Sequence, residues 1–311
     1  MPSLEGAGAI EVRGLRKRFG RVEAVRGVDL RIEPGTTFGL LGLNGSGKST
    51  MLRTMVGLLP PSAGECLLNG IDVHRNRVGA LSGVGFVPDR PTAYAWMRVH
   101  EVVGFAAKLM PGWSDERAGV LLKQCRVPLD ARVGKLSKGT AAKLSLVLAL
   151  GHDPRILILD EPTDGMDPIA RDDFAEQIVA SVCDSPRTVL MSTHGLSEIE
   201  RLADEIGLMH NGSLMLRERT DVLLATTKRV RSVLEVPVGR ADLGARIPGC
   251  VWSRVDGREW TVTVRGVDAG VLEAIRAAGG KNAQVIDMTL DDVFRDVIRG
   301  LEDGAAKEAA A

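Results

Sequence analysis

Glycine, lysine and hydroxyl side chains gather at residues 42–50, whose sequence GLNGSGKST follows the apolar run TFGLL. Residues 42–49 fit the pattern G-x-x-x-x-G-K-[S/T], which cradles phosphate groups when a strand precedes it and a helix follows it. Glycines let successive backbone N–H groups turn toward the α- and β-phosphates, and the helix directs its positive end at the same anion. A glycine-rich turn with an incidental lysine is the alternative, and the flanking strand and helix patterns disfavour it. The residues predicted to contact the nucleotide are Gly42, Asn44, Gly45, Ser46, Gly47, Lys48, Ser49 and Thr50.

Two adjacent carboxylates, Asp160 and Glu161, follow the apolar run at residues 156–159. Open α/β sheets place their ligands at the carboxyl ends of strands, where this pair would lie. Asp160 is expected to hold Mg²⁺ through water together with Ser49, while Lys48 reaches the β- and γ-phosphates. Because neighbouring strand residues point to opposite sides, Glu161 is free to polarise an attacking water. In isolation such a pair more often caps a helix or lies in a solvated turn, but beside a phosphate loop it predicts a hydrolytic site.

The surrounding sequence predicts the elements that position these residues. Residues 36–41 indicate a strand and residues 49–58 a helix, so the phosphate loop lies between them. Residues 156–159 and 188–191 predict strands buried on both faces, as in a parallel sheet flanked by helices. A small antiparallel sheet is predicted from apolar runs at residues 10–12, 22–25 and 27–32.

A helical segment is predicted between the phosphate loop and the acidic pair. Apolar residues at helical spacing cover residues 101–124, interrupted by Pro111-Gly112, and the helical pattern continues to residue 150.

After Asn211-Gly212 the pattern changes to that of a separate α+β domain. Asp256-Gly257 between two apolar runs is a strong hairpin signal, and Thr289 with Asp292 forms a capping box at the start of a helix. The predicted elements are a helix and linker at 220–229, a strand at 232–238, a hairpin from 251–255 and 260–264, and helices at 268–278 and 289–301.

These elements predict an α/β fold: a P-loop nucleotide-binding domain with a mostly parallel core sheet, a small antiparallel sheet and a helical insertion, followed by a small α+β domain. A chain of 311 residues exceeds the size of most single domains, which agrees with this division. The expected boundaries are residues 8–219 for the first domain, with a helical subdomain at about 90–150, then 220–302 for the second domain and 303–311 for a frayed tail.

The composition excludes several other classes. Lysine plus arginine number 40 and aspartate plus glutamate also 40, so no global field draws the chain to nucleic acid, and no nucleic-acid partner is expected. The cysteines Cys66, Cys125, Cys183 and Cys250 are far apart, and we expect them to be reduced. No secretory signal and no apolar run long enough to cross a bilayer is visible, so we expect an intracellular chain whose membrane role needs a separate partner.

Residues 136–140, LSKGT, followed by a helical run, resemble the LSGGQ signature of ABC ATPases. Residues 161–168, EPTDGMDP, are similar to the family's D-loop, and the Ser192-Thr193-His194 triplet is similar to its switch segment. With the phosphate loop and the acidic pair, five motifs run in the family's order between about residues 10 and 215. The chain thus resembles the ATP-binding subunits of bacterial ABC transporters. Residues 289–294 are similar to the tail of those subunits that pair with separate polytopic export permeases.

The resemblance implies roles for residues outside the phosphate loop. ABC ATPases form head-to-tail dimers in which the signature of one subunit closes over ATP bound by the other, so Ser137 and Gly139 would serve the neighbour's nucleotide; Ser137 also fits a plain helix N-cap. Asp167, in the segment similar to the D-loop, is also expected to bind nucleotide. The resemblance places Phe19 where an aromatic ring stacks on adenine and His194 where a side chain contacts the γ-phosphate.

Three positions depart from the family pattern. Asp89 stands where many members carry a glutamine that touches Mg²⁺; a carboxylate suits this cation, and a plain turn residue is the alternative. Lys138 replaces a glycine of the signature and Thr140 replaces its glutamine. We expect these departures to affect the rate of hydrolysis. The side chains needed for the chemistry, Lys48, Glu161 and His194, are nevertheless retained.

The resemblance implies an ATP hydrolase that binds Mg²⁺ and ATP, dimerises with a second ATPase subunit, identical or different, and drives a separate transmembrane permease, with export favoured. Such a chain would lie on the cytoplasmic face of the membrane through its permease. The first alternative is an ABC ATPase that serves DNA repair, ribosomes or iron–sulfur assembly; the tandem cassettes or coiled-coil insertions typical of these are not visible. The second, a P-loop kinase, is disfavoured by the signature and its helix.

Overall fold

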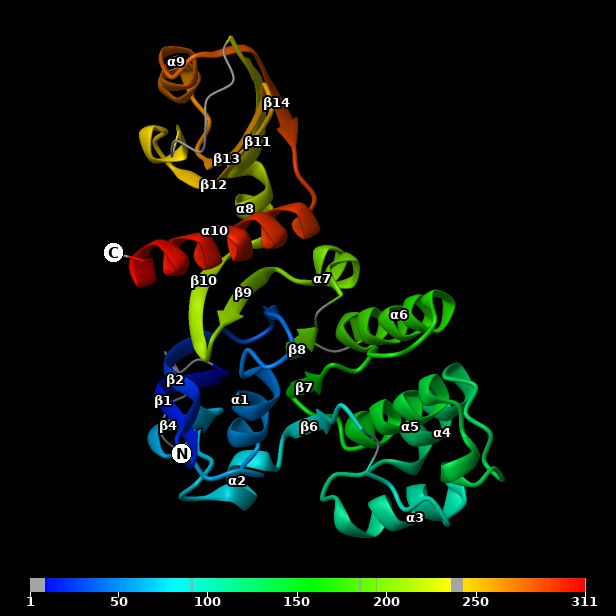
Figure 1. The fold of residues 1–311 in the computed structure, drawn as a ribbon. Coiled ribbons are helices and arrows are strands. Elements are labelled where there is room, and N and C mark those ends of the chain that lie inside the picture. The colour runs from blue at the N-terminus through cyan, green and yellow to red at the C-terminus, as the bar shows by residue number, and fades with distance from the viewer. Residues whose placement is uncertain (1–8, 91, 185, 194, 236–242, 311) are drawn as a thin grey trace. The chain divides into compact units, whose positions relative to one another are not determined.

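The computed structural model describes residues 9–90, 92–184, 186–193, 195–235 and 243–310. The chain divides into two compact units, Met1–Arg217 and Glu218–Ala311, coloured from blue to red along the chain in Figure 1. Parallel and antiparallel sheets with helices beside them confirm the predicted α/β class. In the described ranges, no helix combines the length and the apolar character that crossing a membrane requires.

A six-stranded sheet, in the order β10-β9-β3-β8-β7-β6, forms the centre of the first unit. Its strands from β9 to β6 pair in parallel, which confirms the predicted core sheet. Every residue of β3, β7 and β8 is buried, because their uninterrupted apolar runs suit strands that are covered on both faces. The strands are β3 (Thr37–Leu41), β6 (Val84–Val87), β7 (Ile156–Asp160), β8 (Thr188–Thr193), β9 (Glu205–His210) and β10 (Ser213–Arg219).

The register of this sheet brings the functional segments together. Asp160 at the end of β7 pairs with Ser192 of β8, and Leu41 at the end of β3 pairs with Thr193. The phosphate loop and the acidic pair therefore leave the sheet at neighbouring points on the same edge, where such folds bind ligands.

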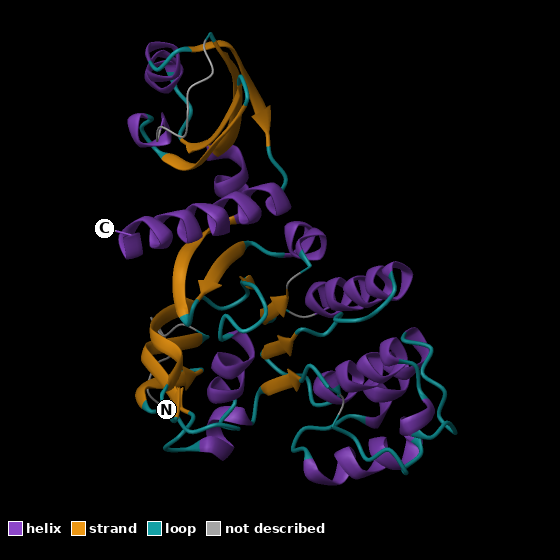
Figure 2. Ribbon diagram, viewed as in Figure 1, coloured by secondary structure: helices purple, strands orange, loops and turns teal. Residues whose placement is uncertain are grey.

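A four-stranded antiparallel sheet, in the order β2-β1-β4-β5, accompanies the core sheet. The predicted runs at 22–25 and 27–32 form one strand, and the last two strands are additional to the prediction. Helix α1 (Lys48–Met55) lies between the two sheets in Figure 2. Its Met51, Leu52 and Met55 pack in one core with residues of both sheets. The strands are β1 (Ile10–Phe19), β2 (Val22–Ile32), β4 (Ala63–Leu68) and β5 (Ile71–Asp72).

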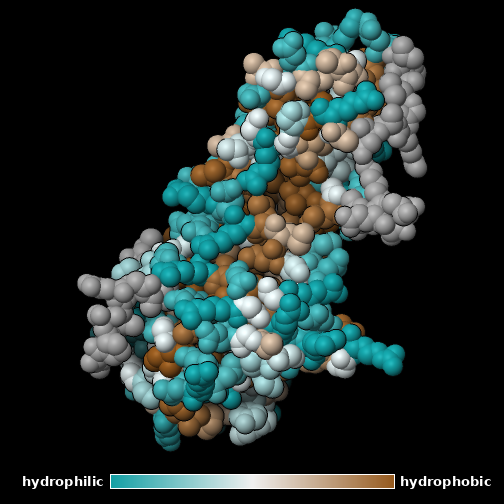
Figure 3. All heavy atoms as spheres, turned by 90° about the vertical axis from the view of Figure 1, so that its left-hand side faces the viewer, coloured by the Kyte–Doolittle hydropathy of each residue, from teal (hydrophilic) through white to brown (hydrophobic). Residues whose placement is uncertain are grey.

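The predicted helical segment follows β6 and is broken where Pro111-Gly112 predicts a break. Its helices pack around their own core, which includes Val99, Leu122 and Val147. The helices of this unit are α2 (Arg77–Leu81), α3 (Val99–Leu109), α4 (Asp115–Gln124), the short η1 (Val133–Lys135), α5 (Lys138–Leu150), α6 (Pro168–Asp184) and α7 (Leu196–Leu202). On the face drawn in Figure 3, the first unit has both hydrophilic and hydrophobic areas.

The second unit contains a four-stranded sheet in the order β12-β13-β11-β14. The predicted hairpin is present, but β12 runs to Asp256 and β13 begins at Glu259, so Gly257 and Arg258 form the turn one residue later than predicted. Residues 227–229, predicted as helix and linker, begin β11 instead, and α10 extends past residue 301. The elements are α8 (Thr220–Thr226), β11 (Thr227–Leu234), η2 (Leu243–Arg246), β12 (Cys250–Asp256), β13 (Glu259–Arg265), α9 (Ala269–Ala277), β14 (Gly280–Asp287) and α10 (Leu290–Ala310).

Helix α10 is fixed to this sheet by polar contacts as well as apolar ones. The predicted capping box is confirmed, because Thr289 Oγ1 accepts from the Asp292 N–H and the Thr289 N–H donates to Asp292. One turn later, buried Asp296 accepts from Thr263 Oγ1 at 2.6 Å and from Arg229 at 2.7 Å. Both bonds end on Oδ2, while Oδ1 accepts no hydrogen bond among the described residues and lies 3.6 Å from Arg299 Nη1.

Three of the four cysteines fall within the described side chains. Cys66, Cys125 and Cys250 are free. Burial raises the pKa of Cys66 to about 12 and that of Cys125 to about 11. Both thiols therefore stay protonated and unreactive near neutral pH.

Candidate nucleotide-binding site

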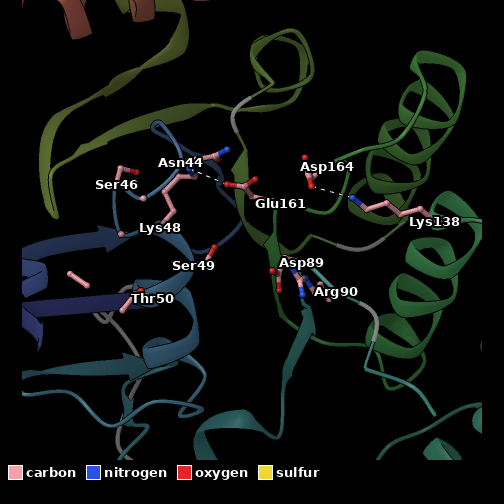
Figure 4. A pocket seen from close by; sticks show the side chains of 13 residues that line it. Asn44, Ser46, Lys48, Ser49, Thr50, Asp89, Arg90, Lys138, Glu161 and Asp164 are labelled. Atoms are coloured by element: carbon pink, nitrogen blue, oxygen red, sulfur yellow. Dashed lines mark hydrogen bonds and ion pairs between the residues drawn. The ribbon is translucent and has the colours of Figure 1, made fainter. Parts of the chain in front are cut away.

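A pocket of about 560 Å³ lies around the phosphate loop (Figure 4). Side chains reach it from β2, from the loop and the start of α1, and from the segments that follow β6 and β7. The first residue of α5 completes the opposite wall. Its lining residues are Ala24, Asn44, Gly45, Ser46, Gly47, Lys48, Ser49, Thr50, Asp89, Arg90, Lys138, Glu161 and Asp164.

The start of α1 offers its backbone to an anion. Gly47 precedes the helix with φ of 106°, a conformation that disfavours a side chain, and no side chain caps the helix. The first N–H groups of a helix have no partner within it and carry a partial positive charge. An anionic ligand such as a phosphate is therefore the natural partner of this end of α1.

Lys48 points across the loop and is only 3% exposed. Its Nζ donates to the carbonyl oxygens of Gly42 at 2.7 Å and Leu43 at 3.2 Å. The same atom lies 3.1 Å from Glu161 Oε1 on the facing wall, as the dashed line in Figure 4 marks. The loop thus holds an ammonium group in place beside the carboxylate that the sequence predicts to be catalytic.

Glu161 has a strained backbone directly after the carboxyl end of β7. Its φ of 45° lies in the left-handed region, which costs a non-glycine residue of this kind about 1 kcal/mol. Two hydrogen bonds hold this conformation, because the Glu161 N–H donates to the Ser192 carbonyl oxygen at 3.1 Å and to its Oγ at 3.0 Å. The turn directs the Glu161 side chain into the pocket, toward Lys48 (Figure 4).

Asp160 lies beneath the pocket and is fully buried. Its Oδ1 accepts from Ser49 Oγ at 2.8 Å and from Ser192 Oγ at 3.0 Å, while Oδ2 has no hydrogen-bond partner among the described residues. Burial raises the pKa of Asp160, and the two hydroxyl donors oppose that shift. The contribution of Ser192 was missed from the sequence, where only its position before His194 was used.

These oxygens fit a magnesium ion. Ser49 Oγ and the carboxylate of Asp160 are hard donors of the kind that Mg²⁺ prefers, and Oδ2 accepts no hydrogen bond among the described residues. Within the described ranges, no three His, Cys, Asp or Glu side chains converge as a metal cluster. A cation here would therefore complete its coordination with water and phosphate oxygens, as Mg²⁺ commonly does.

Asp89 lines the pocket, but it is already engaged by a basic side chain. Arg53 Nη2 donates to Asp89 Oδ1 at 2.8 Å, and Arg53 Nε lies 3.7 Å from Asp160 Oδ2. Sequence reasoning missed Arg53. Its position four residues after Ser49 on one helix was the available signal, because such residues share a face.

Ser137 and Gly139 are not among the described residues that line this pocket. Ser137 caps α5, since its Oγ accepts from the Thr140 N–H at 3.2 Å, and its side chain remains exposed. Lys138, the next residue, does reach the pocket, and its Nζ lies 3.1 Å from Asp164 Oδ2 (Figure 4).

Three other predicted residues lie outside the pocket lining, and a fourth lies outside the residues that the structure describes. Asp167 is exposed and accepts from the Ala170 N–H at 3.0 Å at the start of α6. Phe19 is 48% exposed at the end of β1, with Lys17 Nζ 5.0 Å from the centre of its ring. Gly42 supplies its carbonyl oxygen to Lys48. His194 lies outside the residues that the structure describes.

Comparison with known proteins gives one consistent family. The family model described as "ABC transporter" matches residues 25–164. The ABC transporter ATP-binding protein YtrB of Bacillus subtilis is 30% identical, over 77% of this chain and 82% of its own length. The bacitracin transport ATP-binding protein BcrA of Bacillus licheniformis is 32% identical, over 73% and 74%. The Nod factor export ATP-binding protein I of Ralstonia nicotianae is 36% identical, over 68% and 67%.

Solved structures agree with the sequence relatives. An ATP-binding subunit of an ABC transporter aligns with a TM-score of 0.63 and 27% identity, over 69% of this chain and 92% of its own. CbiO1 from Clostridium perfringens, part of an ABC transporter complex, aligns with a TM-score of 0.61 and 25% identity, over 70% of this chain and 91% of its own. A dimeric ABC transporter cassette that is 23% identical shares the fold, with a TM-score of 0.62 over 68% of this chain and 98% of its own.

Proposed function

The chain belongs to the ABC transporter family, and the relatives reported above are ATP-binding proteins of that family. We propose that the chain hydrolyses Mg·ATP to drive a separate transmembrane permease. One observation carries this proposal: Lys48, Ser49 and Glu161 converge on a single pocket at the carboxyl edge of a parallel sheet. Such a pocket unites an anion-binding helix end, a cation ligand and a carboxylate for water.

The residues divide the chemistry between them. The N–H groups at the start of α1 and the ammonium of Lys48 bind the β- and γ-phosphates. Glu161 orients a water molecule and accepts its proton as the oxygen attacks the γ-phosphorus; the bond to the bridging oxygen breaks, and ADP and phosphate leave. Mg²⁺, held by Ser49 with Asp160, would neutralise charge on the phosphate oxygens.

A second ATPase subunit completes the site in this proposal. Ser137, Gly139 and Asp167 would face the nucleotide of the neighbouring subunit. Support comes from the exposed N-terminus of α5, whose capping Ser137 is exposed and whose Gly139 is absent from the described lining of the chain's own pocket. Phe19 would stack on adenine with its exposed ring, and His194 would contact the γ-phosphate, as the resemblance implies.

The same proposal extends to the membrane. BcrA is named for bacitracin transport, and the Nod factor protein for export. By analogy with these relatives we infer that this chain serves an exporter and works at the cytoplasmic face of the membrane through its permease. Co-purification with a polytopic protein in detergent would support this inference, and recovery of the chain without one would count against it.

The hydrolytic role of Glu161 is tested by Glu161→Gln. This variant keeps the size and one hydrogen-bonding oxygen of the side chain but cannot accept the proton, so ATP binding persists while turnover falls by about 10²-fold or more. Binding is measured with a fluorescent ATP analogue and turnover by phosphate release. Glu176→Gln, an exposed glutamate on α6, is the control and keeps both. Normal turnover in Glu161→Gln would reject Glu161 as the base.

A further inference from the structure

The acidic side chains that line the nucleotide pocket each contact a basic side chain. For Glu161 and Asp164, the basic partner, Lys48 or Lys138, itself lines the pocket. For Asp89, the partner is Arg53, which is not among the described lining residues and approaches from the side of α1. Arg53 therefore contacts the pocket lining through the carboxylate that it holds.

The position of Arg53 follows from the helix that binds the phosphate. Ser49 and Arg53 are four residues apart, so they lie on one face of α1. That face meets two carboxylates: Ser49 donates to buried Asp160 at 2.8 Å, and Arg53 donates to Asp89 at 2.8 Å while its Nε lies 3.7 Å from Asp160. The guanidinium thus lies between two acidic groups that would otherwise face each other across the site.

The charge balance of the pocket makes this contact important for the ligand. A nucleotide triphosphate is strongly anionic, and every uncompensated carboxylate near it weakens binding by Coulomb repulsion. Asp89 is one-third exposed and lines the pocket, so its charge is not hidden from the ligand. A neutral side chain at this position would carry no such penalty.

We propose that Arg53 is a positioning and charge-compensating residue that holds Asp89 as a neutral pair, which lets a carboxylate stand beside the triphosphate without repelling it. This inference rests on the proposed nucleotide binding and extends it to a residue that does not touch the ligand. It makes a specific prediction: most of the effect of Arg53 on nucleotide affinity disappears when position 89 is neutral, and what remains reflects Asp160, whose Oδ2 lies 3.7 Å from Arg53 Nε.

An ordinary structural ion pair is the competing explanation. Such a pair would tie α1 to the segment after β6 and would change stability when broken, and surface pairs of this kind are worth little. A structural role would not make nucleotide affinity depend on the charge at position 89. Affinity measured on a charge-paired set of variants therefore separates the two roles.

The experiment measures binding of a fluorescent ATP analogue in EDTA, where neither metal binding nor hydrolysis contributes. The variants are Arg53→Met, Asp89→Asn and the double variant, with Arg75→Met as the control because Arg75 is 85% exposed and pairs with Asp72 elsewhere on the unit. We expect Arg53→Met to bind about tenfold more weakly, since an uncompensated charge near the phosphates is worth about 1 kcal/mol or slightly more. Asp89→Asn binds as tightly as the wild type or tighter, and the double variant regains most of the loss.

Two further measurements sharpen the result. The deficit of Arg53→Met shrinks in high salt, because salt screens exposed charges. Arg53→Lys retains the positive charge and keeps most of the affinity, and it replaces Arg53→Met if thermal unfolding shows that the latter does not fold.

The inference is overturned if Arg53→Met binds the analogue like the wild type, or if the double variant is as weak as Arg53→Met. If Arg53→Met does not fold and Arg53→Lys loses the affinity, compensation by charge is equally excluded. Failure of the wild-type chain to bind the analogue would be a different result, because it would reject the proposed function itself.

Discussion

Asp160 and Glu161 are neighbours in sequence with opposite environments. Asp160 is fully buried and accepts hydrogen bonds from Ser49 and Ser192, whereas Glu161 turns into the pocket through a left-handed backbone. Ser192 supports both, since its Oγ donates to Asp160 and accepts from the Glu161 N–H. This arrangement gives one carboxylate the setting of a cation ligand and the other that of a base.

Two glycines of the phosphate loop provide a matched pair of variants. A Cβ at Gly47 would lie 2.3 Å from the Ala24 carbonyl oxygen, and φ is 106°, so Gly47→Ala should cost about 2 kcal/mol or more of stability and most of the nucleotide affinity. Gly45 also has a positive φ, but nothing lies within 4 Å of its Cβ position, so Gly45→Ala should cost only about 1 kcal/mol. Urea unfolding and analogue titration measure both; equal effects would contradict this account.

Local sequence was sufficient for the residues that a motif contains, but not for those that only the fold brings near. Lys48, Ser49 and Glu161 were predicted to share a site, and they line one pocket. Ser192 and Arg53 reach the same region because β8 lies beside β7 and because α1 lies against β7. Such contacts depend on strand order and helix rotation, which periodicity does not specify.

At the scale of elements, the cap of α5 combines two roles that substitution can separate. Ser137→Ala removes the hydrogen bond to the Thr140 N–H and should cost about 1 kcal/mol of stability. Ser137→Asp retains a good cap, so stability persists, but its negative charge would face the phosphates of the neighbouring subunit and turnover should fall. Urea unfolding with phosphate release tests this; unchanged turnover in Ser137→Asp would confine Ser137 to capping.

His152, just after α5, makes the first unit sensitive to acid. Burial lowers its pKa below the ordinary 6.5, and Nδ1 is buried with no hydrogen-bond partner among the described residues. The unfolded chain therefore binds this proton more readily, so the stabilisation is full above pH 6.5 and is lost as pH falls below it. His152→Gln should reduce the pH dependence of the free energy of unfolding between about pH 7.5 and pH 5, as measured by urea unfolding at each pH. His100→Gln, at a half-exposed site, is the control, and an unchanged slope in His152→Gln would contradict the assignment.

The sequence predicted some of the elements and missed others. The buried strands β3, β7 and β8 and the helices flanking Pro111-Gly112 carry long apolar patterns or a clear breaker. Strands β4, β5, β6, β9, β10 and β14 were missed: β4 is exposed at its first two residues, β14 is mostly exposed, and β6 is mostly buried but only four residues long. Short or exposed strands are specified by their pairing partners more than by their own composition.

At the scale of the whole molecule, the proposed head-to-tail dimer predicts complementation between defective chains. Lys48→Ala removes the phosphate lysine, and Ser137→Asp impairs the surface offered to the neighbour, so each variant alone should be nearly inactive. In a mixed dimer, one site combines intact Lys48 from one chain with intact Ser137 from the other. An equal mixture should regain up to about a quarter of wild-type turnover, because random pairing makes half of the dimers mixed and each has one intact site. Activity no greater than the sum of the two separate variants would contradict a shared site.

The sequence predicts a division of the chain because its pattern changes after Asn211-Gly212. The boundary between the two compact units lies between Arg217 and Glu218, two residues before the expected one. The partner of the first unit was accessible only through the resemblance, since Ser137 and Gly139 have no ligand within their own chain that spacing could indicate. Arrangement between subunits depends on surfaces, which leave little trace in periodicity.

The ion pair between Lys48 and Glu161 has a consequence for nucleotide binding. The Lys48 ammonium lies 3.1 Å from Glu161 Oε1, so Glu161 and the phosphate that Lys48 is proposed to bind share one cation. In the proposed mechanism, a bound γ-phosphate competes with Glu161 for this ammonium and leaves the carboxylate to contact the attacking water. One lysine would thereby link the arrival of the nucleotide to the release of the proposed base, Glu161.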